Sequence, residues 1–233
     1  MSVFETVMIR NGHPVFLREH LSRLEQACRK CGFEFTPIQL DPLAQLLINS
    51  VPEGLARIYV TAGDGGVSSP AEECRVFILV EPRDPIVPEV YQRGYELGLS
   101  NEIHHPMFGG LKTGNYWSNL VALNLAKPRN ETLLFNACGE LISACMANVF
   151  IVRDGEIQTP ALISGARNGV IREWVIQRRK VSECKLTRDN LREADALFLT
   201  SSWIGVMPVT ALEERSLSVH AIATGLIREF SGS

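Results

Sequence analysis

The sequence lacks an excess of charge of either sign. Its 233 residues include 23 Lys and Arg and 26 Asp and Glu, which gives a formal net charge of −3 at pH 7. Proteins that bind nucleic acid or an anionic membrane surface present a concentrated basic surface. The composition therefore indicates neither a nucleic-acid partner nor a membrane partner.

Long hydrophobic runs are also absent. No apolar stretch approaches the ~20 residues that a membrane-spanning helix needs. The opening residues, Met-Ser-Val-Phe-Glu-Thr, include an acidic residue and have no apolar core of the kind found in a signal peptide. We therefore expect a soluble, cytoplasmic protein.

Cysteine is scarce, with six residues in the chain. Without a secretion signal, these cysteines are expected to be free thiols. Cys28 and Cys31 have the spacing of a redox or zinc pair, but no second pair completes a set of four ligands. Both also lie inside a helical pattern at residues 15–31, so we interpret them as small residues of a helix and expect no metal site.

The pattern of strands and helices indicates a mixed α/β (α+β) protein of two domains. The first predicted domain, residues 1–100, contains strands at 3–10, 56–61, 74–81 and 91–100, and helices at 15–31 and 41–50. A polar, turn-rich segment at 101–110 is the predicted linker. In the second domain, residues 111–233, we expect helices at 116–126, 170–180 and 186–194, with strands at 131–136, 141–152, 156–159 and 196–200 and a return strand ending at 209.

One lysine stands out at the start of the second domain. Lys112 follows two glycines and precedes the helix at 116–126, in the run Phe108-Gly-Gly-Leu-Lys112-Thr-Gly-Asn115. A lysine held against apolar groups loses hydration, which lowers its pKa and lets its amine attack a carbonyl to form a Schiff base. By itself this pattern is more typical of a solvated surface lysine, so other segments have to decide its role.

Two further segments have the chemistry of a phosphate site. Gly169 permits a tight turn before the helix that starts at Val170, and the first amides of a helix bind anions. The segment 200–202 offers three hydroxyls at the end of a strand. Each pattern is common in proteins that bind no phosphate.

Taken in order, these segments resemble the class IV aminotransferase family, the fold type IV pyridoxal phosphate (PLP) enzymes. The resemblance rests on motifs spread over residues 3–212: Val3-Phe-Glu-Thr, His20-Leu-Ser-Arg23-Leu24, Lys112-x-x-Asn115, Glu131, Gly139 with Asn148-Val-Phe, Thr159-Pro160, Gly169-Val-Ile-Arg172 and Gly205-x-x-Pro208-Val209. It implies a fold like that of D-amino acid aminotransferase, with a small N-terminal α/β domain and a larger C-terminal pseudo-barrel domain. It also implies PLP as the cofactor, bound between the domains, a small amino compound as the substrate, and a homodimer.

The resemblance assigns roles to individual residues. Lys112 matches the Schiff-base lysine and is the expected catalytic residue. The other expected cofactor-binding residues are Ser143, discussed below, and four that match the groups binding the PLP phosphate in the family, namely Arg23, Val170, Ile171 and Ser202. Arg57 matches an arginine that some relatives use for the substrate carboxylate, although a solvent-facing strand arginine is an equal alternative. Tyr116 faces either the substrate and cofactor or the core.

The chain departs from the family pattern at Ser143. Relatives have Gly-x-Val-x-Glu-x-x-x-x-Asn, where the glutamate faces the pyridine nitrogen, and Ser143 occupies the glutamate position. Glu140 cannot replace it, because an odd offset along a strand points to the opposite face. A serine can hydrogen-bond the nitrogen but cannot keep it protonated, which weakens the electron sink.

These features predict an aminodeoxychorismate lyase-like enzyme, which eliminates pyruvate to give 4-aminobenzoate. Elimination that forms an aromatic ring tolerates a weak electron sink better than transamination does. One alternative is an aminotransferase acting on a branched-chain or D-amino acid. Another, from a different class, is a weakly active or non-catalytic relative that binds PLP.

Overall fold

The computed structural model describes residues 1–33, 35, 40–47, 50–64, 74–106 and 110–232. The chain divides into two compact units, Met1–Pro85 with Leu111–Tyr116, and Ile86–Gly110 with Trp117–Ser233. Phe108 and Gly109, which belong to the predicted lysine motif, lie outside the described residues. None of the described helices is long and apolar enough to cross a membrane.

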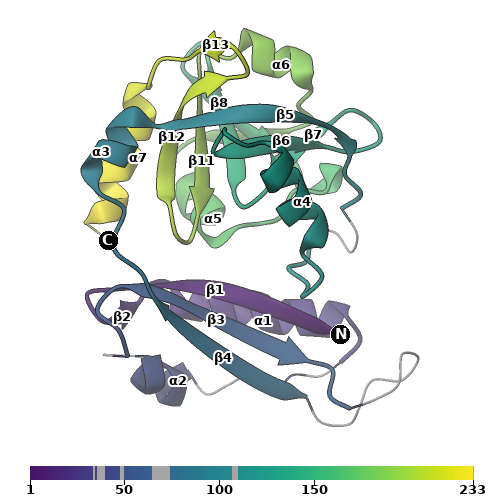
Figure 1. Ribbon diagram of the computed structural model, residues 1–233, viewed down its shortest axis with the longest axis vertical. Helices are drawn as coiled ribbons and strands as arrows, with labels where there is room; N and C mark the ends of the chain where they lie inside the picture. Colours follow the sequence, from purple (N-terminus) through teal and green to yellow (C-terminus); the bar gives the residue numbers. More distant parts are fainter. Residues whose placement is uncertain (34, 36–39, 48–49, 65–73, 107–109, 233) are drawn as a thin grey trace. The chain divides into compact units, whose positions relative to one another are not determined.

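The first unit is a four-stranded antiparallel sheet with two helices. Its strands are β1 (Ser2–Arg10), β2 (His13–Pro14), β3 (Gly54–Thr61) and β4 (Arg75–Pro82), in the order β2-β1-β3-β4. The helices are α1 (Leu17–Lys30), which lies along β1, and α2 (Leu40–Leu47) (Figure 1). These elements agree with the strands and helices expected from the alternating and helical patterns.

One face of this sheet carries the core of the first unit. Alternate residues of β1 and β3 point to the same side of a strand, and here they pack against the apolar stripe of α1. The members are Val3, Val7, Ile9, Ala56, Ile58 and Val60 from the sheet and Leu17, Leu21, Leu24, Ala27 and Cys28 from the helix. Cys28 is therefore a core residue of a helix, whereas Cys31 is exposed, and all six cysteines are free.

The second unit is built on a nine-stranded mixed sheet. Its main path runs β10-β9-β8-β11-β12-β5-β6-β7, with β13 beside β12. The strands are β5 (Tyr95–Ile103), β6 (Glu131–Phe135), β7 (Leu141–Ala144), β8 (Asn148–Arg153), β9 (Glu156–Pro160), β10 (Val181–Cys184), β11 (Ala196–Ser201), β12 (Gly205–Leu212) and β13 (Arg215–Ser216).

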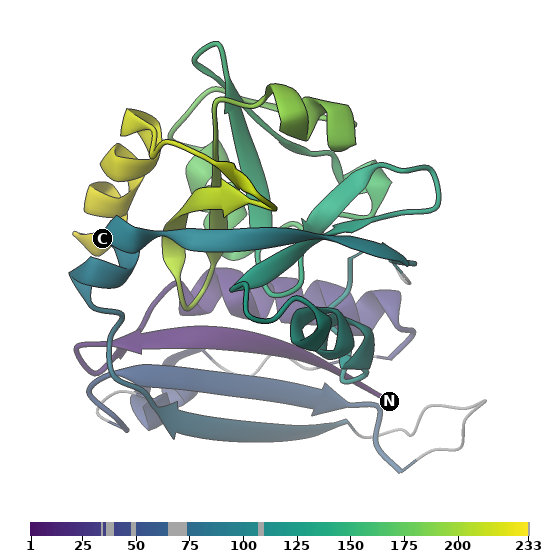
Figure 2. The same ribbon diagram turned by 45° about the horizontal axis from the view of Figure 1, so that its top comes forward.

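The sheet of the second unit curls around its own core (Figure 2). The backbone N–H of Leu141, at the start of β7, donates to the carbonyl of Leu186, which follows β10, at 2.7 Å. The two ends of the sheet are therefore joined by a hydrogen bond. This curled sheet confirms the expected pseudo-barrel.

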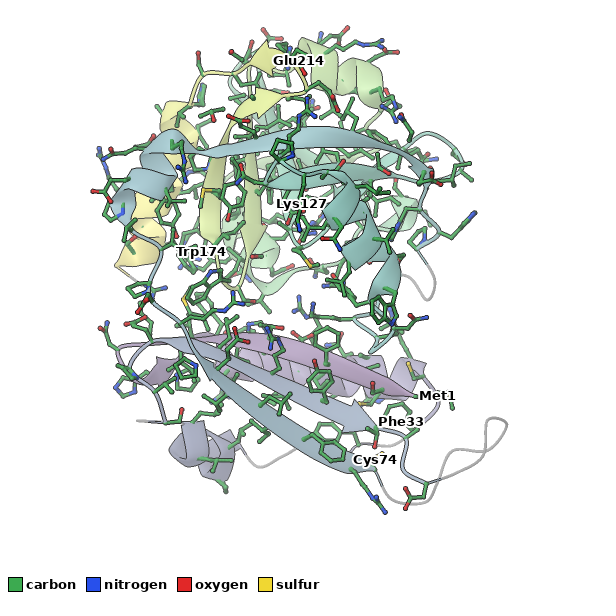
Figure 3. The ribbon with its side chains drawn as sticks, viewed as in Figure 1. Met1, Phe33, Cys74, Lys127, Trp174 and Glu214 are labelled. Atoms are coloured by element: carbon green, nitrogen blue, oxygen red, sulfur yellow. The ribbon has the colours of Figure 1, made fainter. Side chains whose placement is uncertain are left out.

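Helices cover the outside of this curled sheet. They are α3 (Pro88–Arg93), α4 (Trp117–Leu125), the short 3-10 helix η1 (Leu162–Ser164), α5 (Val170–Ile176), α6 (Arg188–Glu193) and α7 (Ala221–Ser231). Trp174 of α5, labelled in Figure 3, belongs to this layer. Its ring meets that of Phe230 of α7 edge to face, with ring centroids 5.5 Å apart. The expected helix at 116–126 is α4, and its large apolar side chains are exposed, with Trp117 and Leu125 each more than two-thirds accessible.

Several boundaries differ from those expected. The strand expected at 91–100 is α3 followed by β5, and the expected run at 141–152 is two strands with a turn between them. The helix expected at 170–180 ends at Ile176.

The contact-based units also group two segments differently from the predicted domains. Residues 86–100 belong with the second unit because β5 is paired in parallel with β6 and β12. Leu111–Tyr116 belongs with the first unit because it pairs with β1. The expected linker at 101–110 includes the last residues of β5. The domain boundaries themselves stay a prediction.

Candidate active site

The lysine segment is attached to the start of β1. The backbone N–H of Phe4 donates to the Lys112 carbonyl and that of Gly114 to the Ser2 carbonyl, both at 2.9 Å. Val3 and Thr113 form an antiparallel bridge. Because β2 pairs only with the far end of β1, this edge of β1 is available to the lysine segment. The backbone of Lys112 is thereby held by pairing with a strand that lies more than 100 residues earlier in the sequence.

The Lys112 amine lies over two aromatic rings. Its Nζ is 4.2 Å from the centroid of Phe4 and 4.3 Å from that of Tyr116. Phe4 and Tyr116 meet edge to face, and Phe4 stacks on Tyr59 of β3 with centroids 5.0 Å apart. Aromatic faces at this distance attract a cation and restrict where the amine can lie. The structure thus brings Tyr116 to the lysine, and it adds Phe4 and Tyr59, to which the sequence gave no role.

Arg57 lies on the same face of the sheet as Tyr59, since the two are separated by one residue on β3. Its Nη1 donates to Glu81 Oε2 at 2.8 Å, and Glu81 also accepts from Arg83 Nε at 2.6 Å. Hydrogen bonds from Arg83 and Arg57 lower the pKa of Glu81. Arg57 is therefore half-buried and ion-paired, and its role toward a substrate carboxylate stays a prediction.

Arg23 of α1 forms a bidentate ion pair with the buried carboxylate of Glu5. Its Nε and Nη2 donate to the two oxygens of Glu5 at 2.8 and 2.5 Å, and His20 Nδ1 lies 2.9 Å from Glu5 Oε2. Burial alone would raise the pKa of Glu5, but Arg23 and the His20 hydrogen bond outweigh it and lower the pKa to about 2. Burial lowers the pKa of His20.

Lys112 and Arg23 contact neighbouring residues of β1 that point to opposite faces. The Lys112 amine lies over the ring of Phe4, whereas the Arg23 guanidinium pairs with Glu5 on the side of the strand that α1 covers. The sequence motif Val3-Phe-Glu-Thr contained both partners, and the missing information was which side of the strand each residue faces.

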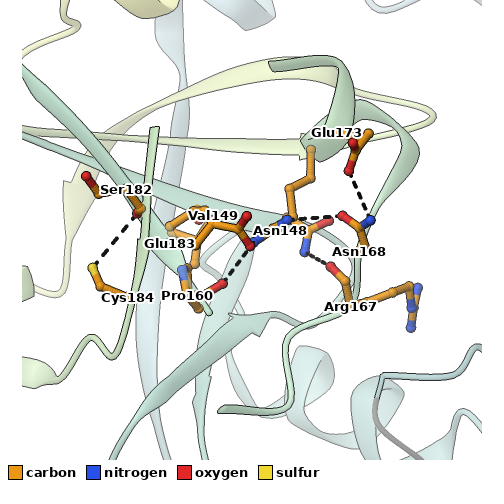
Figure 4. Close-up of polar contacts among 11 residues, drawn as sticks. Asn148, Val149, Pro160, Arg167, Asn168, Glu173, Ser182, Glu183 and Cys184 are labelled. Carbon is orange, nitrogen blue, oxygen red and sulfur yellow. Dashed lines mark hydrogen bonds and ion pairs between the residues drawn. The ribbon is translucent and has the colours of Figure 1, made fainter. Parts of the chain in front are cut away.

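In the second unit, Val170 and Ile171 begin α5 as expected. Gly169 caps the helix in an extended conformation, and its φ of −68° is open to any residue. A Cβ at this glycine would lie 2.1 Å from Asn148 Oδ1, so the glycine is required for close approach to β8 rather than for an unusual backbone angle. Asn148 Nδ2 donates to the Arg167 carbonyl at 2.8 Å, which ties β8 to this loop (Figure 4).

The buried side chain of Arg172 also supports the loop that precedes α5. Arg172 is 1% exposed, and its guanidinium donates to Asn168 Oδ1 at 3.0 Å, the Pro160 carbonyl at 3.1 Å and Glu183 Oε2 at 2.5 Å. Asn168 Nδ2 in turn donates to Glu173 Oε2 at 3.0 Å (Figure 4). This network fixes the turn that presents the first amides of α5.

The predicted hydroxyl segment ends β11 next to the same asparagine. Thr200 is the register partner of Asn148 in the β8–β11 pair, and the half-buried Ser202 follows two residues later. Thr200 Oγ1 is buried and has no hydrogen-bond partner in the part of the chain that the structure describes. A partnerless buried hydroxyl beside a helix start is the donor chemistry that suits a phosphate. The residues of the second unit therefore fit the phosphate of PLP.

Ser143 lies on β7, opposite Leu134 of β6, and is half-buried. Glu140 does not substitute for it, because its carboxylate accepts from Asn136 Nδ2 at 3.0 Å and pairs with Lys185 Nζ at 2.7 Å. Hydrogen bonds, chiefly from Lys185, lower the pKa of Glu140 to about 2. The carboxylate of Glu131 is also engaged, because it accepts a hydrogen bond from the backbone N–H of Met146 at 3.1 Å.

Among the described residues, no group of three His, Cys, Asp or Glu side chains is placed to hold a metal ion. The polar groups described are an amine and guanidinium groups in the first unit, and amides and hydroxyls in the second. These groups suit an organic, phosphate-bearing cofactor.

Comparison with known proteins identifies the family. The family model for amino-transferase class IV matches residues 2–212. A Bacillus subtilis aminodeoxychorismate lyase is 29% identical over 230 residues, covering 92% of this chain and 78% of the relative. A Thermotoga maritima relative named "Probable branched-chain-amino-acid aminotransferase" is 36% identical over 228 residues, with coverage of 92% and 78%.

Solved structures agree. The crystal structure of 4-amino-4-deoxychorismate lyase from Pseudomonas aeruginosa superposes with a TM-score of 0.87 at 27% identity, covering 100% of this chain and 90% of that one. The match spans both units and the segments that carry the site motifs. The chain therefore belongs to the class IV aminotransferase family of PLP-dependent transaminases and lyases, and its cofactor is pyridoxal phosphate.

Proposed function

We propose that this enzyme is an aminodeoxychorismate lyase, which converts 4-amino-4-deoxychorismate to 4-aminobenzoate and pyruvate. The observation that carries the proposal is Ser143, a hydroxyl where relatives place a carboxylate. The nearby carboxylates of Glu131 and Glu140 are engaged by Met146 and Lys185. By the family resemblance, Ser143 is the group that would meet the pyridine nitrogen.

The proposed cofactor ligands are the residues that the family resemblance assigns, with Thr200 added. Lys112 would hold the cofactor through its amine, and Ser143 would hydrogen-bond the ring nitrogen. The phosphate would be bound by charged and amide donors and by hydroxyls, namely Arg23, Val170, Ile171, Thr200 and Ser202. Thr200 joins this list because its buried hydroxyl lacks a partner among the described residues. Arg23 brings a guanidinium already oriented by Glu5.

PLP, when bound, withdraws electrons from the bonds at the carbon that bears the substrate amine. The chain must supply a base there, and Lys112 is the proposed one, removing the proton and later returning one. The rings of Phe4 and Tyr116 restrict the positions that the Lys112 amine can take. Arg57 and Tyr116 are the proposed substrate contacts, with Arg57 directed to a carboxylate.

A hydroxyl at the ring nitrogen favours elimination over transamination. Serine cannot keep the nitrogen protonated, so charge at the substrate carbon is poorly stabilised. Loss of pyruvate from aminodeoxychorismate yields an aromatic ring, and this product stability lowers the demand on the cofactor. Transamination has no such compensation and also needs a proton delivered to the cofactor carbon.

The test is product analysis with the purified, PLP-loaded enzyme. Equimolar 4-aminobenzoate and pyruvate from aminodeoxychorismate are expected, with loss of both in Lys112→Ala. The matched control is Lys127→Ala, at an exposed lysine after α4. Borohydride reduction should leave a cofactor mass adduct on the peptide containing Lys112. Absence of the adduct and of visible cofactor absorbance would support the non-catalytic alternative.

A second candidate is an aminotransferase acting on a branched-chain or D-amino acid. The 36% identity to the Thermotoga maritima relative favours it. Formation of glutamate from 2-oxoglutarate with leucine or D-alanine as the donor, without turnover of aminodeoxychorismate, would decide for this activity. A cytoplasmic location and a homodimer remain predictions.

A further inference from the structure

A groove of about 580 Å³ lies between α3 and α7 of the second unit. The two helices lie next to each other in both views of the ribbon (Figure 1, Figure 2). They form the walls of the groove, and the buried Pro208 of β12 also lines it. Sites for small organic molecules have volumes of ~300–1,000 Å³. The groove therefore has the size of a ligand site, and its lining includes none of the residues assigned to the cofactor.

The packing of the two helices on β12 leaves this groove open. α7 buries Ala223, Leu226 and Phe230. A second stripe of α7, with the spacing i, i+3, i+4 and i+7, lines the groove and comprises Thr224, Ile227, Arg228 and Ser231. α3 is six residues long and ends at Gly94, where a Cβ would lie 2.7 Å from Thr210 Cγ2. The end of α3 is thus held close to β12, and the second stripe of α7 still faces open space.

The walls of the groove are mainly apolar. Val219, which precedes α7, is 41% exposed, and Ile86, which precedes α3, is half-buried. Ile227 contributes a third aliphatic side chain. The Tyr91 hydroxyl donates to the Ile204 carbonyl at 3.1 Å, so the polar end of this ring is bound to the protein. Walls of this kind take up the hydrocarbon part of a ligand.

Arg228 gives the groove a positive charge. Among the described residues that line the groove, it is the one charged side chain. The adjacent Glu229 is paired with Arg179, and no described residue pairs with the Arg228 guanidinium. A guanidinium presents two parallel N–H donors that match the two oxygens of a carboxylate. The groove therefore suits an organic anion, with Gln92 and Thr224 as neutral polar contacts.

The same lining disfavours a phosphate and an amino acid. Phosphate sites commonly use helix-start amides, but α3 begins with Pro88, which has no N–H. At the start of α7, the Ile222 amide already donates to His220 Nδ1 at 3.2 Å. An amino acid carries an ammonium group that needs an acidic partner, and the described lining residues include no acidic side chain. The chemistry that fits is a carboxylate on an apolar body.

We propose that the groove between α3 and α7 is a second binding site, which takes a small organic acid with one carboxylate on an apolar body such as an arene. Arg228 pairs with the carboxylate, and the apolar walls enclose the rest of the molecule. Because the ligand contacts α3 and α7 together, it stabilises their packing on β12. The site is independent of the proposed chemistry, so failure of one leaves the other intact.

Photo-cross-linking with 4-benzoylbenzoate tests the location of the site. This probe carries one carboxylate on two rings, and under near-ultraviolet light its ketone forms a covalent adduct at a neighbouring C–H bond. With PLP-loaded protein, peptide mass spectrometry should find adducts within residues 86–92 or 219–231. The neutral analogue 4-(hydroxymethyl)benzophenone should label these peptides far less. Adducts confined to other peptides, or equal labelling by the neutral analogue, would overturn the proposal.

Calorimetric titration with the same probe tests the role of Arg228. Arg228→Gln should weaken binding about tenfold or more, because a charge-assisted hydrogen bond is lost. Its melting temperature without ligand should equal that of the wild type, since the side chain is exposed. The matched control, Arg93→Gln, removes a positive charge from an exposed position of α3 outside the groove and should bind as the wild type does. Wild-type affinity in the Arg228 variant, an equal loss in the Arg93 variant, or no saturable binding by the wild type would contradict the proposed site.

Discussion

Glu131 accepts the backbone N–H of Met146 with both carboxylate oxygens, at 3.1 and 3.3 Å. Glu131 begins β6 and is 5% exposed, and Met146 lies in the turn that joins β7 to β8. Ser143 precedes this turn and Asn148 follows it, so one buried carboxylate fixes the segment next to the proposed cofactor contact Ser143. Asn119 Nδ2 also holds this turn, through the Cys145 carbonyl at 2.7 Å.

The ionisation of Glu131 should make stability depend on pH. Burial raises its pKa from 4.5 to about 7, although amide donors such as Met146 favour the charged form. Because the folded chain holds the proton more tightly, the free energy of unfolding should fall as pH rises from about 4.5 to about 7. The total change is on the order of 3 kcal/mol. Glu131→Gln should remove this slope while keeping an acceptor for the amide.

Urea unfolding at pH 5 and pH 8 measures this effect. The variant should lose less stability than the wild type between the two values. Glu156→Gln, at an exposed carboxyl of β9, is the control and should keep the wild-type difference. An unchanged slope in Glu131→Gln would assign the pH dependence to other groups.

The Glu5–Arg23 pair should give stability a pH dependence of the opposite sign. With a folded pKa of about 2 against 4.5, Glu5 contributes stability that is present above pH 4.5 and lost as pH falls through 2. Arg23→Gln leaves the buried carboxylate without its guanidinium, which should cost about 3–5 kcal/mol at pH 7. The cost should shrink at pH 4, because the carboxyl can then take up a proton.

The control for Arg23 lies on the same helix. Arg29 pairs with Glu25 at the surface, and Arg29→Gln should change stability by less than about 0.5 kcal/mol. Arg23→Lys keeps the charge but loses the bidentate grip. If Arg23 also binds the phosphate, this variant should weaken PLP affinity, measured by fluorescence titration of folded protein. A Lys variant with wild-type PLP affinity would restrict Arg23 to its structural role.

The third prediction concerns the close approach of Gly169 and Asn148 at the start of α5. In Gly169→Ala the new methyl group would overlap Asn148 Oδ1, which should destabilise the protein by about 1–3 kcal/mol. Because φ is −68°, the cost should come from contact and not from backbone conformation. Shortening the neighbour in Gly169→Ala with Asn148→Ser should therefore recover part of the loss, in a double-mutant cycle followed by thermal melting. Additive losses would contradict this explanation.

Local patterns predicted the elements that carry their own signals. The alternation of β1, the apolar stripe of α1 and the glycine before α5 identified these elements directly. α7 was missed because its cap is His220, whose side chain accepts from the Ile222 amide, and histidine is not a typical capping residue. β10 was missed because it is four residues long.

The partners of the site residues could not be predicted in the same way. Lys112 was found from its glycines and the following helix, but its contact with Phe4 depends on pairing between segments over 100 residues apart. The Glu5–Arg23 pair depends on which face of β1 meets α1. The place of β5 between β6 and β12 is likewise a tertiary fact, and for that reason residues 86–100 were predicted to lie in the first domain.

Ser143→Glu tests the explanation of the proposed reaction. A carboxylate opposite the pyridine nitrogen keeps that nitrogen protonated, and a charged hydrogen bond contributes ~1.5–3 kcal/mol. If the gain appears in the transition state, transamination with leucine or D-alanine should rise about tenfold or more. Lyase activity should change less, because formation of the aromatic ring already drives it. Glutamate formation and 4-aminobenzoate release are measured on the same PLP-loaded preparation.

Two matched variants separate charge from size at this position. Ser143→Gln places a neutral side chain of similar length there, and it should give no gain in transamination because it cannot hold the proton. Ser143→Ala removes the hydroxyl and should lower cofactor affinity without raising either rate. Since Ser143 is half-buried on a short strand, circular dichroism must show each variant folded. A PLP-loaded Glu variant that transaminates no faster than wild type would show that the ring nitrogen does not control the choice of reaction.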